Sequence, residues 1–115
     1  MNRYSFSFLN KLIAFVVFLT ALSTFSLTVE PTASFWDAGE YISTSAKLQI
    51  GHPPGAPLFQ MLGAIFSILA FDVTQIAYAV NMMSVTSSAL TIMFLFWSIS
   101  LIAKEILKVK EIVKV

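Results

Sequence analysis

The chain has no cysteine among its 115 residues, and only 11% of its residues are charged. Without cysteine there can be no disulfide, thiolate nucleophile or cysteine-based metal site. The low charge and a mean hydropathy of +0.83 separate the chain from soluble domains, in which about a quarter of the residues are charged. A net charge of +1, with no basic block interleaved with aromatic residues, gives no support to nucleic-acid binding. The composition therefore predicts a small membrane protein.

The short motifs of several common enzyme classes are also missing. The chain has no P-loop, G-x-G-x-x-G, H-E-x-x-H or G-x-S-x-G sequence, so nucleotide hydrolysis, zinc proteolysis and serine hydrolysis have no support. His52 is the only histidine. Without a second histidine or a cysteine beside it, no metal site is predicted from the ligand types that zinc prefers.

Two long uncharged runs dominate the rest of the sequence. Leu12 to Val29 contains 18 residues without a charge, just enough to cross about 30 Å of hydrocarbon as a helix. Because Arg3 and Lys11 precede this run, a cleaved signal peptide is the alternative. Met82 to Ala103 contains 22 such residues, within a segment that reads as helical over about 76–103. We therefore predict membrane spans at 12–29 and about 76–103.

The polar groups gather between these runs, in the segment from Phe35 to Pro57. Apolar and polar residues separate at helical spacing, which predicts an interfacial helix at about 34–50 that ends at Gly51. Its water-facing side is predicted to carry Asp37, Glu40, Thr44 and Lys47. A second short helix is expected at about 56–71, where Leu58 to Phe71 has 14 uncharged residues, fewer than a span needs.

Charge decides between two membrane topologies. The loop 30–75 contains four acids against Lys47, whereas the basic residues gather toward the two ends of the chain, at Arg3, Lys11, Lys104, Lys108, Lys110 and Lys114. Basic residues favour the cytoplasmic side, so we expect an extracytoplasmic loop 30–75 and a cytoplasmic tail 104–115. The predicted fold is an all-α membrane protein in which two transmembrane helices flank two interfacial helices. Three transmembrane helices, with 58–71 crossing a thinned bilayer, are the alternative.

Asp37 and Glu40 are the leading candidates for chemistry. Residues three apart are neighbours on a helix, and acids at a membrane surface can act as a general base, hold a divalent cation, or orient a phosphate through that cation. The structural interpretation of Asp37 is a capping box that begins at Ser34. For Glu40 it is a solvated charge that reaches toward Thr44 or Lys47.

Three further residues are candidates for binding a substrate. Trp36 and Tyr41 are most simply aromatic anchors at the membrane interface, and they could also line a sugar or lipid site. His52 lies in the sequence GHPPGAP, whose prolines stiffen the backbone and whose glycines permit close approach to a ligand. An imidazole there could hold a phosphate or an acceptor, and the structural alternative is a hydrogen-bonded turn residue.

Two sequence elements resemble the amino-terminal signature of a known family. They are Trp36-Asp37-Ala38-Gly39-Glu40-Tyr41 and the run from Lys47 to Phe59, KLQIGHPPGAPLF. The family is that of the transmembrane protein O-mannosyltransferase-like proteins, large multi-pass membrane proteins once catalogued as a domain of unknown function and frequent in Bacteroidetes. The resemblance covers nearly all of this chain and only the amino-terminal part of a family member.

The resemblance implies a function and a role for each candidate residue. More distantly, the arrangement is similar to the GT-C glycosyltransferases, in which Asp37 takes the position of the catalytic acid and Glu40 that of a second candidate. His52-Pro53-Pro54 resembles the HPP element of classical O-mannosyltransferases. The implied activity is transfer of a sugar, mannose by this resemblance, from a polyprenyl-phosphate donor to a protein acceptor, at a bacterial inner membrane. The competing hypothesis is a non-catalytic membrane scaffold or assembly subunit.

Overall fold

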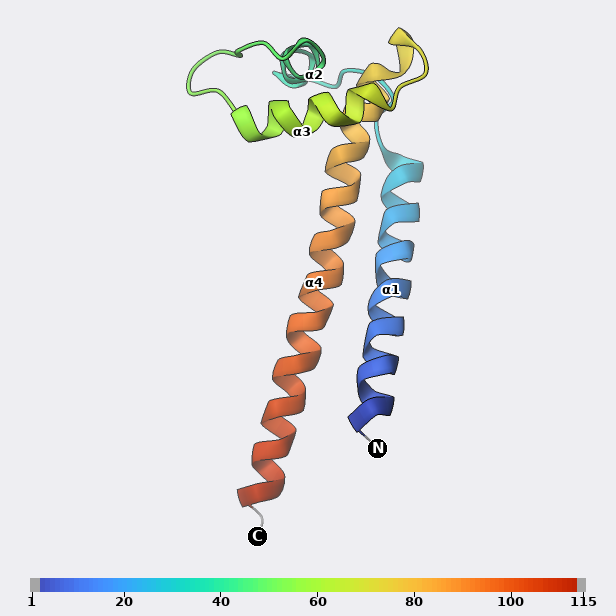
Figure 1. The fold of residues 1–115 in the computed structure, drawn as a ribbon, viewed down its shortest axis with the longest axis vertical. Helices are drawn as coiled ribbons and strands as arrows, with labels where there is room; N and C mark the ends of the chain where they lie inside the picture. Colours follow the sequence, from blue (N-terminus) through green and yellow to red (C-terminus); the bar gives the residue numbers. More distant parts are fainter. Residues whose placement is uncertain (1–2, 114–115) are drawn as a thin grey trace. The chain divides into compact units, whose positions relative to one another are not determined.

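The computed structural model describes the backbone of residues 3–113 and the side chains of residues 6–108. The described part contains helices and no strand: α1 (Arg3–Thr28), α2 (Ala38–Lys47), α3 (Pro57–Ile68), the short 3-10 helix η1 (Val73–Gln75) and α4 (Ile76–Val113) (Figure 1). The chain forms two compact units, Met1–Thr24 with Ser88–Val115, and Phe25–Ser87. The all-α fold is confirmed.

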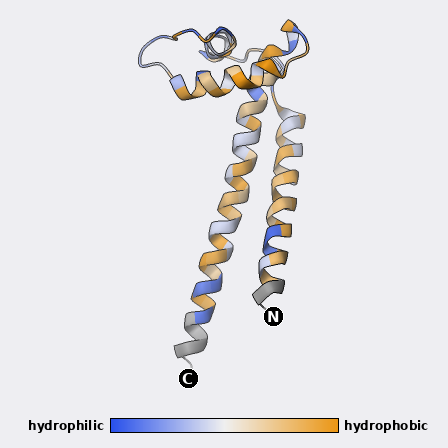
Figure 2. Cartoon of the chain, viewed as in Figure 1, coloured by the Kyte–Doolittle hydropathy of each residue, from blue (hydrophilic) through white to orange (hydrophobic). Residues whose placement is uncertain are grey.

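Two segments of helix are long and apolar enough to cross a membrane, Phe6–Thr28 and Val73–Lys108. Hydrophobic residues cover both along most of their lengths (Figure 2). In the most apolar 18-residue stretch of each segment, only 6% and 11% of the residues, respectively, are buried within the protein. The 12 residues of α3 are about 18 Å long at 1.5 Å per residue, well short of the roughly 30 Å of hydrocarbon. Two long helices flanking two short ones confirm the predicted all-α architecture, and α3 is shorter than a span of ordinary thickness needs.

The helix boundaries differ from the predicted ones at several ends. The first helix begins at Arg3 and ends at Thr28, just before the predicted stop at Glu30 and Pro31. The last helix continues past the predicted end at residue 103 to Val113, because lysine, glutamate and leucine in the tail are good helix formers. The side chains of Arg3, Lys110 and Glu111, and all of Lys114, lie outside the described residues.

The start of α2 contradicts the predicted capping box. The helix begins at Ala38 rather than at residue 34, because Trp36 has a positive φ of 62° that interrupts helical geometry. Asp37 itself occupies the N-cap position and makes no side-chain capping hydrogen bond. The carboxylate is therefore not engaged by the backbone of its own helix.

The end of α2 also precedes the expected stop at Gly51. Leu48 adopts the left-handed conformation, with φ 49° and ψ 48°. The Leu48 N–H donates to the Ser45 carbonyl and the Gln49 N–H to the Thr44 carbonyl, which is the Schellman pattern of a helix C-terminus. A leucine thus fills the position that sequence patterns assign to glycine, and the loop that leads to His52 begins three residues earlier than predicted.

In the unit that contains the two chain ends, small side chains lie at the helix contacts. Ala14 and Ala21 of α1 and Ala89 of α4 are buried, and small residues allow membrane helices to approach closely. Toward the ends of the two helices, the Lys104 ammonium lies 4.6 Å from the centre of the Phe6 ring. This distance is typical of a cation–π contact.

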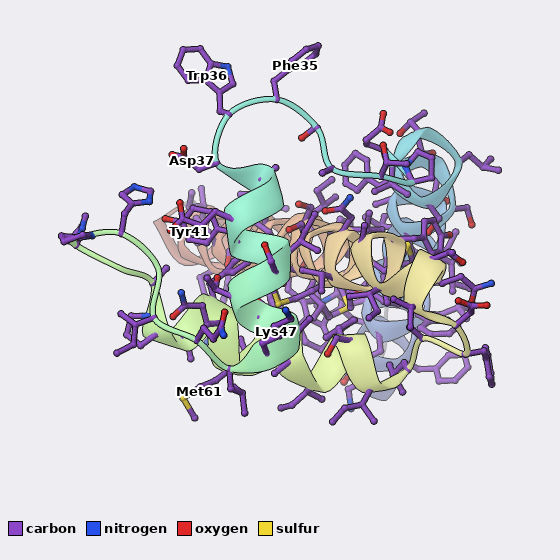
Figure 3. The ribbon with its side chains drawn as sticks, turned by 90° about the horizontal axis from the view of Figure 1, so that it is seen from above. Phe35, Trp36, Asp37, Tyr41, Lys47 and Met61 are labelled. Atoms are coloured by element: carbon purple, nitrogen blue, oxygen red, sulfur yellow. The ribbon has the colours of Figure 1, made fainter. Side chains whose placement is uncertain are left out.

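In the unit of residues 25–87, α2 crosses α3 at a glycine. Figure 1 views α2 along its axis while α3 runs across the view, and Figure 3 shows the same crossing from above. Ser45 is fully buried here, and a side chain at Gly63 would lie 2.6 Å from the Ser45 Oγ and 2.8 Å from its Cβ. Only glycine permits this approach.

The same crossing buries a polar pair that the helical pattern had placed in water. Gln60 of α3 donates through its amide to the Thr44 hydroxyl at 3.3 Å, and both residues are buried. Thr44 was predicted on the water-facing side of α2. It is instead covered by α3. This burial is tolerated because the Thr44 hydroxyl makes its hydrogen bonds inside the protein.

A side-chain amide of α4 binds the chain that follows α1. The Asn81 amide donates to the Glu30 carbonyl at 2.8 Å and to the Thr32 carbonyl at 3.0 Å. These carbonyls follow the end of a helix and have no helical partner of their own. Asn81 therefore fixes the path of the connection that leads to α2.

The crossing predicts a strong effect of one added methyl group. We expect Gly63→Ala to weaken the packing of α2 on α3 by about 1–3 kcal/mol, as over-packed cores do, and hydrogen exchange of the α2 amides to quicken accordingly. The matched control is Gly39→Ala, whose added atom would meet only the Ala33 Cβ at 3.8 Å. Equal exchange in the two variants would contradict a tight crossing at Gly63.

Candidate functional site

Glu40 holds His52 through both of its carboxylate oxygens. The His52 backbone N–H donates to Glu40 Oε1 at 2.6 Å, and the His52 Nδ1 lies 2.8 Å from Glu40 Oε2. Charge-assisted hydrogen bonds of this length are among the stronger ones in proteins. Glu40 therefore fixes both the main chain and the ring of a residue 12 positions away, and does not reach toward Thr44 or Lys47 as the solvated alternative supposed.

The loop that carries His52 is a tight turn. The Gly55 N–H donates to the His52 carbonyl at 2.8 Å, and the Pro53–Pro54 peptide bond between them is cis, which is the arrangement of a type VI turn. Gly51 lies where an added Cβ would come within 3.0 Å of Glu40 Oε1 and 3.1 Å of the Gln60 amide nitrogen. A side chain at position 51 would push the loop away from α2.

The pair shifts the titration of both groups. The hydrogen bond that Glu40 accepts from the His52 ring, and then the charge of Glu40, raise the pKa of His52 above the ordinary 6.5. The backbone N–H of His52, and then its ring, lower the pKa of Glu40 below the ordinary 4.5. Both shifts favour the charged forms of the two groups, and so the ion pair. Its contribution to stability is lost as the pH rises through the raised pKa of His52, or falls through the lowered pKa of Glu40.

Asp37 completes the cluster from the start of α2. Its Oδ2 lies 4.0 Å from the His52 Nε2, and its side chain is 61% exposed. Glu40, at 38% exposed, has both oxygens engaged by the loop, whereas the Asp37 side chain caps no backbone amide of its helix. In the part of the chain that the structure describes, no group of three or more histidines and acids could hold a metal ion. The more accessible carboxylate is that of Asp37.

The two aromatic candidates lie in different surroundings. Tyr41 packs edge-on against Phe59, with ring centres 5.3 Å apart, and lines a cavity of about 370 Å³ formed by Ala38, Tyr41, Ile42, Ala56, Phe59, Asn81 and Ser84. Trp36 is 97% exposed and points away from α2 together with Phe35 (Figure 3). Tyr41 also lies beside Glu40 and His52, whereas Trp36 lies outside the cluster.

The sequence reasoning missed the residues that support the cluster. Gln60 and Gly51 both lie within reach of Glu40 or Thr44, and neither was proposed for the site. A signal was available for Gln60, since it is the only side-chain amide in a mostly apolar helix. For Gly51 the sequence indicated a helix stop and a loop glycine that permits close approach, but not its contact with Glu40, because contacts between distant segments leave no local pattern.

The fold is that of a helical membrane protein in which a polar cluster lies on the connection between two long apolar helices. The chain belongs to the family described as the Protein O-mannosyl-transferase TMEM260 N-terminal domain, whose family model matches residues 37–114. The matched region contains Asp37, Glu40, Tyr41 and His52.

Two curated relatives have the corresponding name. A protein O-mannosyl-transferase tmem260 from Dictyostelium discoideum is 34% identical over 87 residues, which cover 75% of this chain and 11% of the relative. The Protein O-mannosyl-transferase TMEM260 from Mus musculus is 32% identical over 83 residues, 72% of this chain and 12% of the relative. The chain therefore spans about a ninth of the length of these relatives. No solved structure matches it.

Because His52 is the only histidine in the chain, its titration can be followed as a single imidazole resonance by NMR. We expect a pKa above 6.5 in the unmodified chain and a fall toward 6.5 in Glu40→Gln, since the neutral amide keeps the size of the side chain and loses its charge. Asp37→Asn serves as the comparison and should lower the pKa by less, because that carboxylate is 4.0 Å rather than 2.8 Å away. An unchanged titration in Glu40→Gln would rule out the ion pair.

Proposed function

We propose that this chain is the amino-terminal part of a membrane glycosyltransferase that transfers mannose from a polyprenyl-phosphate donor to a hydroxyl of a protein acceptor. The support from relatives is the printed name of the family and of the two curated proteins. The support from geometry is the cluster of Asp37, Glu40 and His52, in which one acid positions the imidazole and the other stays accessible. The proposal depends on this difference between the two acids: Glu40 is bonded to His52, and Asp37 stays accessible.

Asp37 acts as the general base in this proposal. Its carboxylate accepts the proton of the acceptor hydroxyl while the acceptor oxygen forms a bond to the anomeric carbon of the sugar. The bond between that carbon and the phosphate oxygen breaks, and the polyprenyl phosphate leaves with the bonding electrons. The transfer inverts the configuration at the anomeric carbon, because attack and departure occur on opposite faces.

His52 stabilises the phosphate in the same proposal. Glu40 lies 2.8 Å from Nδ1 and raises the pKa of His52, which favours the protonated imidazole. In that form the Nε2–H on the other side of the ring donates to a phosphate oxygen. Glu40 is thereby reassigned from second catalytic acid to positioning residue, since neither of its oxygens is left for the acceptor. Tyr41 lines the neighbouring cavity and is the better candidate than Trp36 for contact with a sugar.

A divalent cation is not given a role in this mechanism. Both oxygens of Glu40 are hydrogen-bonded to His52, which leaves Asp37 as the more accessible carboxylate of the cluster. Magnesium is commonly bound through one or two carboxylates together with substrate phosphates. The cluster therefore fits such an ion only where Asp37 and the donor phosphate hold it together.

The proposal places residues 30–75 on the extracytoplasmic side of the membrane, a bacterial inner membrane by the family resemblance. The basic residues at both ends of the chain support this orientation, because they favour the cytoplasm. A lipid-linked donor is then presented to the site from the outer leaflet.

Sugar transfer should depend on Asp37 and not on acidity of the loop in general. In the complete gene product we expect Asp37→Asn to lower transfer to an acceptor peptide by about 100-fold or more, the range of general-base catalysis. The control is Asp72→Asn, the same chemical change at a residue whose carboxylate accepts only from the Thr74 N–H at the start of η1. Its transfer should stay near normal.

The same measurement separates the enzyme from a scaffold. Both variants should insert into membranes normally, so a loss confined to Asp37→Asn supports catalysis. Unchanged transfer in Asp37→Asn would remove the residue from the base role. Absence of any transfer by the unmodified gene product, with polyprenyl-phosphate mannose supplied, would favour the scaffold.

The absence of cysteine makes the orientation directly testable. Single cysteines can be introduced as Ser34→Cys in the loop and Lys108→Cys near the end of α4. A membrane-impermeant maleimide added to intact cells should label position 34, and should label position 108 only after the membrane is permeabilised. The reverse pattern would overturn the extracytoplasmic placement of the site.

A further inference from the structure

A second cavity lies between the first part of α1 and residues 97–104 of α4, and shares no residue with the cluster. Its volume is about 310 Å³, within the range of small-ligand sites. The residues that line it include Phe6, Ser7, Asn10, Lys11, Trp97 and Lys104. All belong to the unit formed by Met1–Thr24 and Ser88–Val115.

The two lysines of this cavity mark the end of the apolar run on each helix. Lys11 immediately precedes the uncharged residues 12–29, and Lys104 immediately follows the uncharged residues 82–103. Their helices run in opposite directions, and both lysines line one cavity, beside which the Lys104 ammonium stacks on the Phe6 ring. The cavity therefore lies where hydrocarbon gives way to headgroups.

The charges of the cavity are not balanced by acids of the surrounding helices. The residues that line it include no aspartate or glutamate. Within residues 6–24 and 88–108 the sequence has one acid, Glu105, and its carboxylate lies 3.8 Å from Lys108. A concave site lined by charges of one sign concentrates counter-ions, so the cavity is suited to an anion.

The other polar groups at the cavity are hydrogen-bond donors. The Ser7 hydroxyl, the Asn10 amide and the Trp97 indole N–H can all donate to phosphate oxygens. Tryptophan is also typical of the membrane interface, where its ring is in the apolar region and its N–H reaches the headgroups. Donors of this kind beside two ammonium groups match a phosphodiester at the membrane surface.

We propose that this cavity binds the phosphate of an anionic phospholipid headgroup, with Lys11 and Lys104 as the two cationic ligands. Basic pockets between membrane helices recognise such headgroups. The site is independent of the sugar-transfer cluster, since it shares no residue with it. It would anchor the ends of the two long helices to one lipid molecule.

Native mass spectrometry of the complete gene product with bound phosphatidylglycerol or phosphatidylcholine tests the proposal. We expect preferential retention of phosphatidylglycerol. Lys11→Gln and Lys104→Gln should each weaken the binding of phosphatidylglycerol about fivefold, which is roughly the contribution of one basic residue near a charged membrane surface. The double variant should weaken it about 25-fold. Lys47→Gln, the same change on α2, should leave retention unchanged.

Further arms distinguish charge from structure and lipid from free anion. The double variant with arginine at positions 11 and 104 should retain the lipid, because it preserves both charges. Equal retention of the two lipids, or full retention by the double glutamine variant, would overturn the proposal. Displacement of phosphatidylglycerol by an equal concentration of inorganic phosphate would overturn the assignment to a lipid headgroup.

Discussion

Both oxygens of the Glu40 carboxylate are taken by His52, one by the backbone N–H and one by the ring. This one side chain joins α2 to the turn that precedes α3, so the position of the turn relative to α2 depends on it. The loop approaches the Glu40 carboxylate closely at position 51 because glycine has no side chain there. Glu40 engages only the Nδ1 side of the ring, and Asp37 stays 4.0 Å from Nε2 with a side chain that is 61% exposed.

The crossing of α2 and α3 provides the second support of the cluster. Ser45 and Gly63 bring the two helices together closely, and Gln60 bonds to Thr44 within the same contact. The Ser45 hydroxyl is buried there without a hydrogen-bond partner, which costs free energy unless close packing offsets it. The helices that flank the turn are thus held at one fixed crossing, and the turn carries His52 at a defined distance from both acids.

The sequence predicted the helical membrane fold and the residues that meet in the cluster, and it did so from patterns with local causes. Uncharged runs reveal long helices, and charge within a polar loop reveals candidate acids. The pairing of Glu40 with His52 could not be derived in this way, because it depends on how α2 and α3 cross. The capping box failed for a related reason: the S-x-x-D spacing was present, but the left-handed Trp36 delayed the helix until Asp37 became its first flanking residue.

The Asn81 amide binds two carbonyls, those of Glu30 and Thr32, that precede it by 51 and 49 residues. A ribosome adds residues in order, so these carbonyls leave the exit tunnel long before the amide that will bind them. The connection after α1 therefore gains these bonds only once the beginning of α4 has been made, and the loop that bears the acids is closed at its base by a later part of the chain. The loop that carries the acids can therefore reach its final arrangement only after the start of α4 has been synthesised.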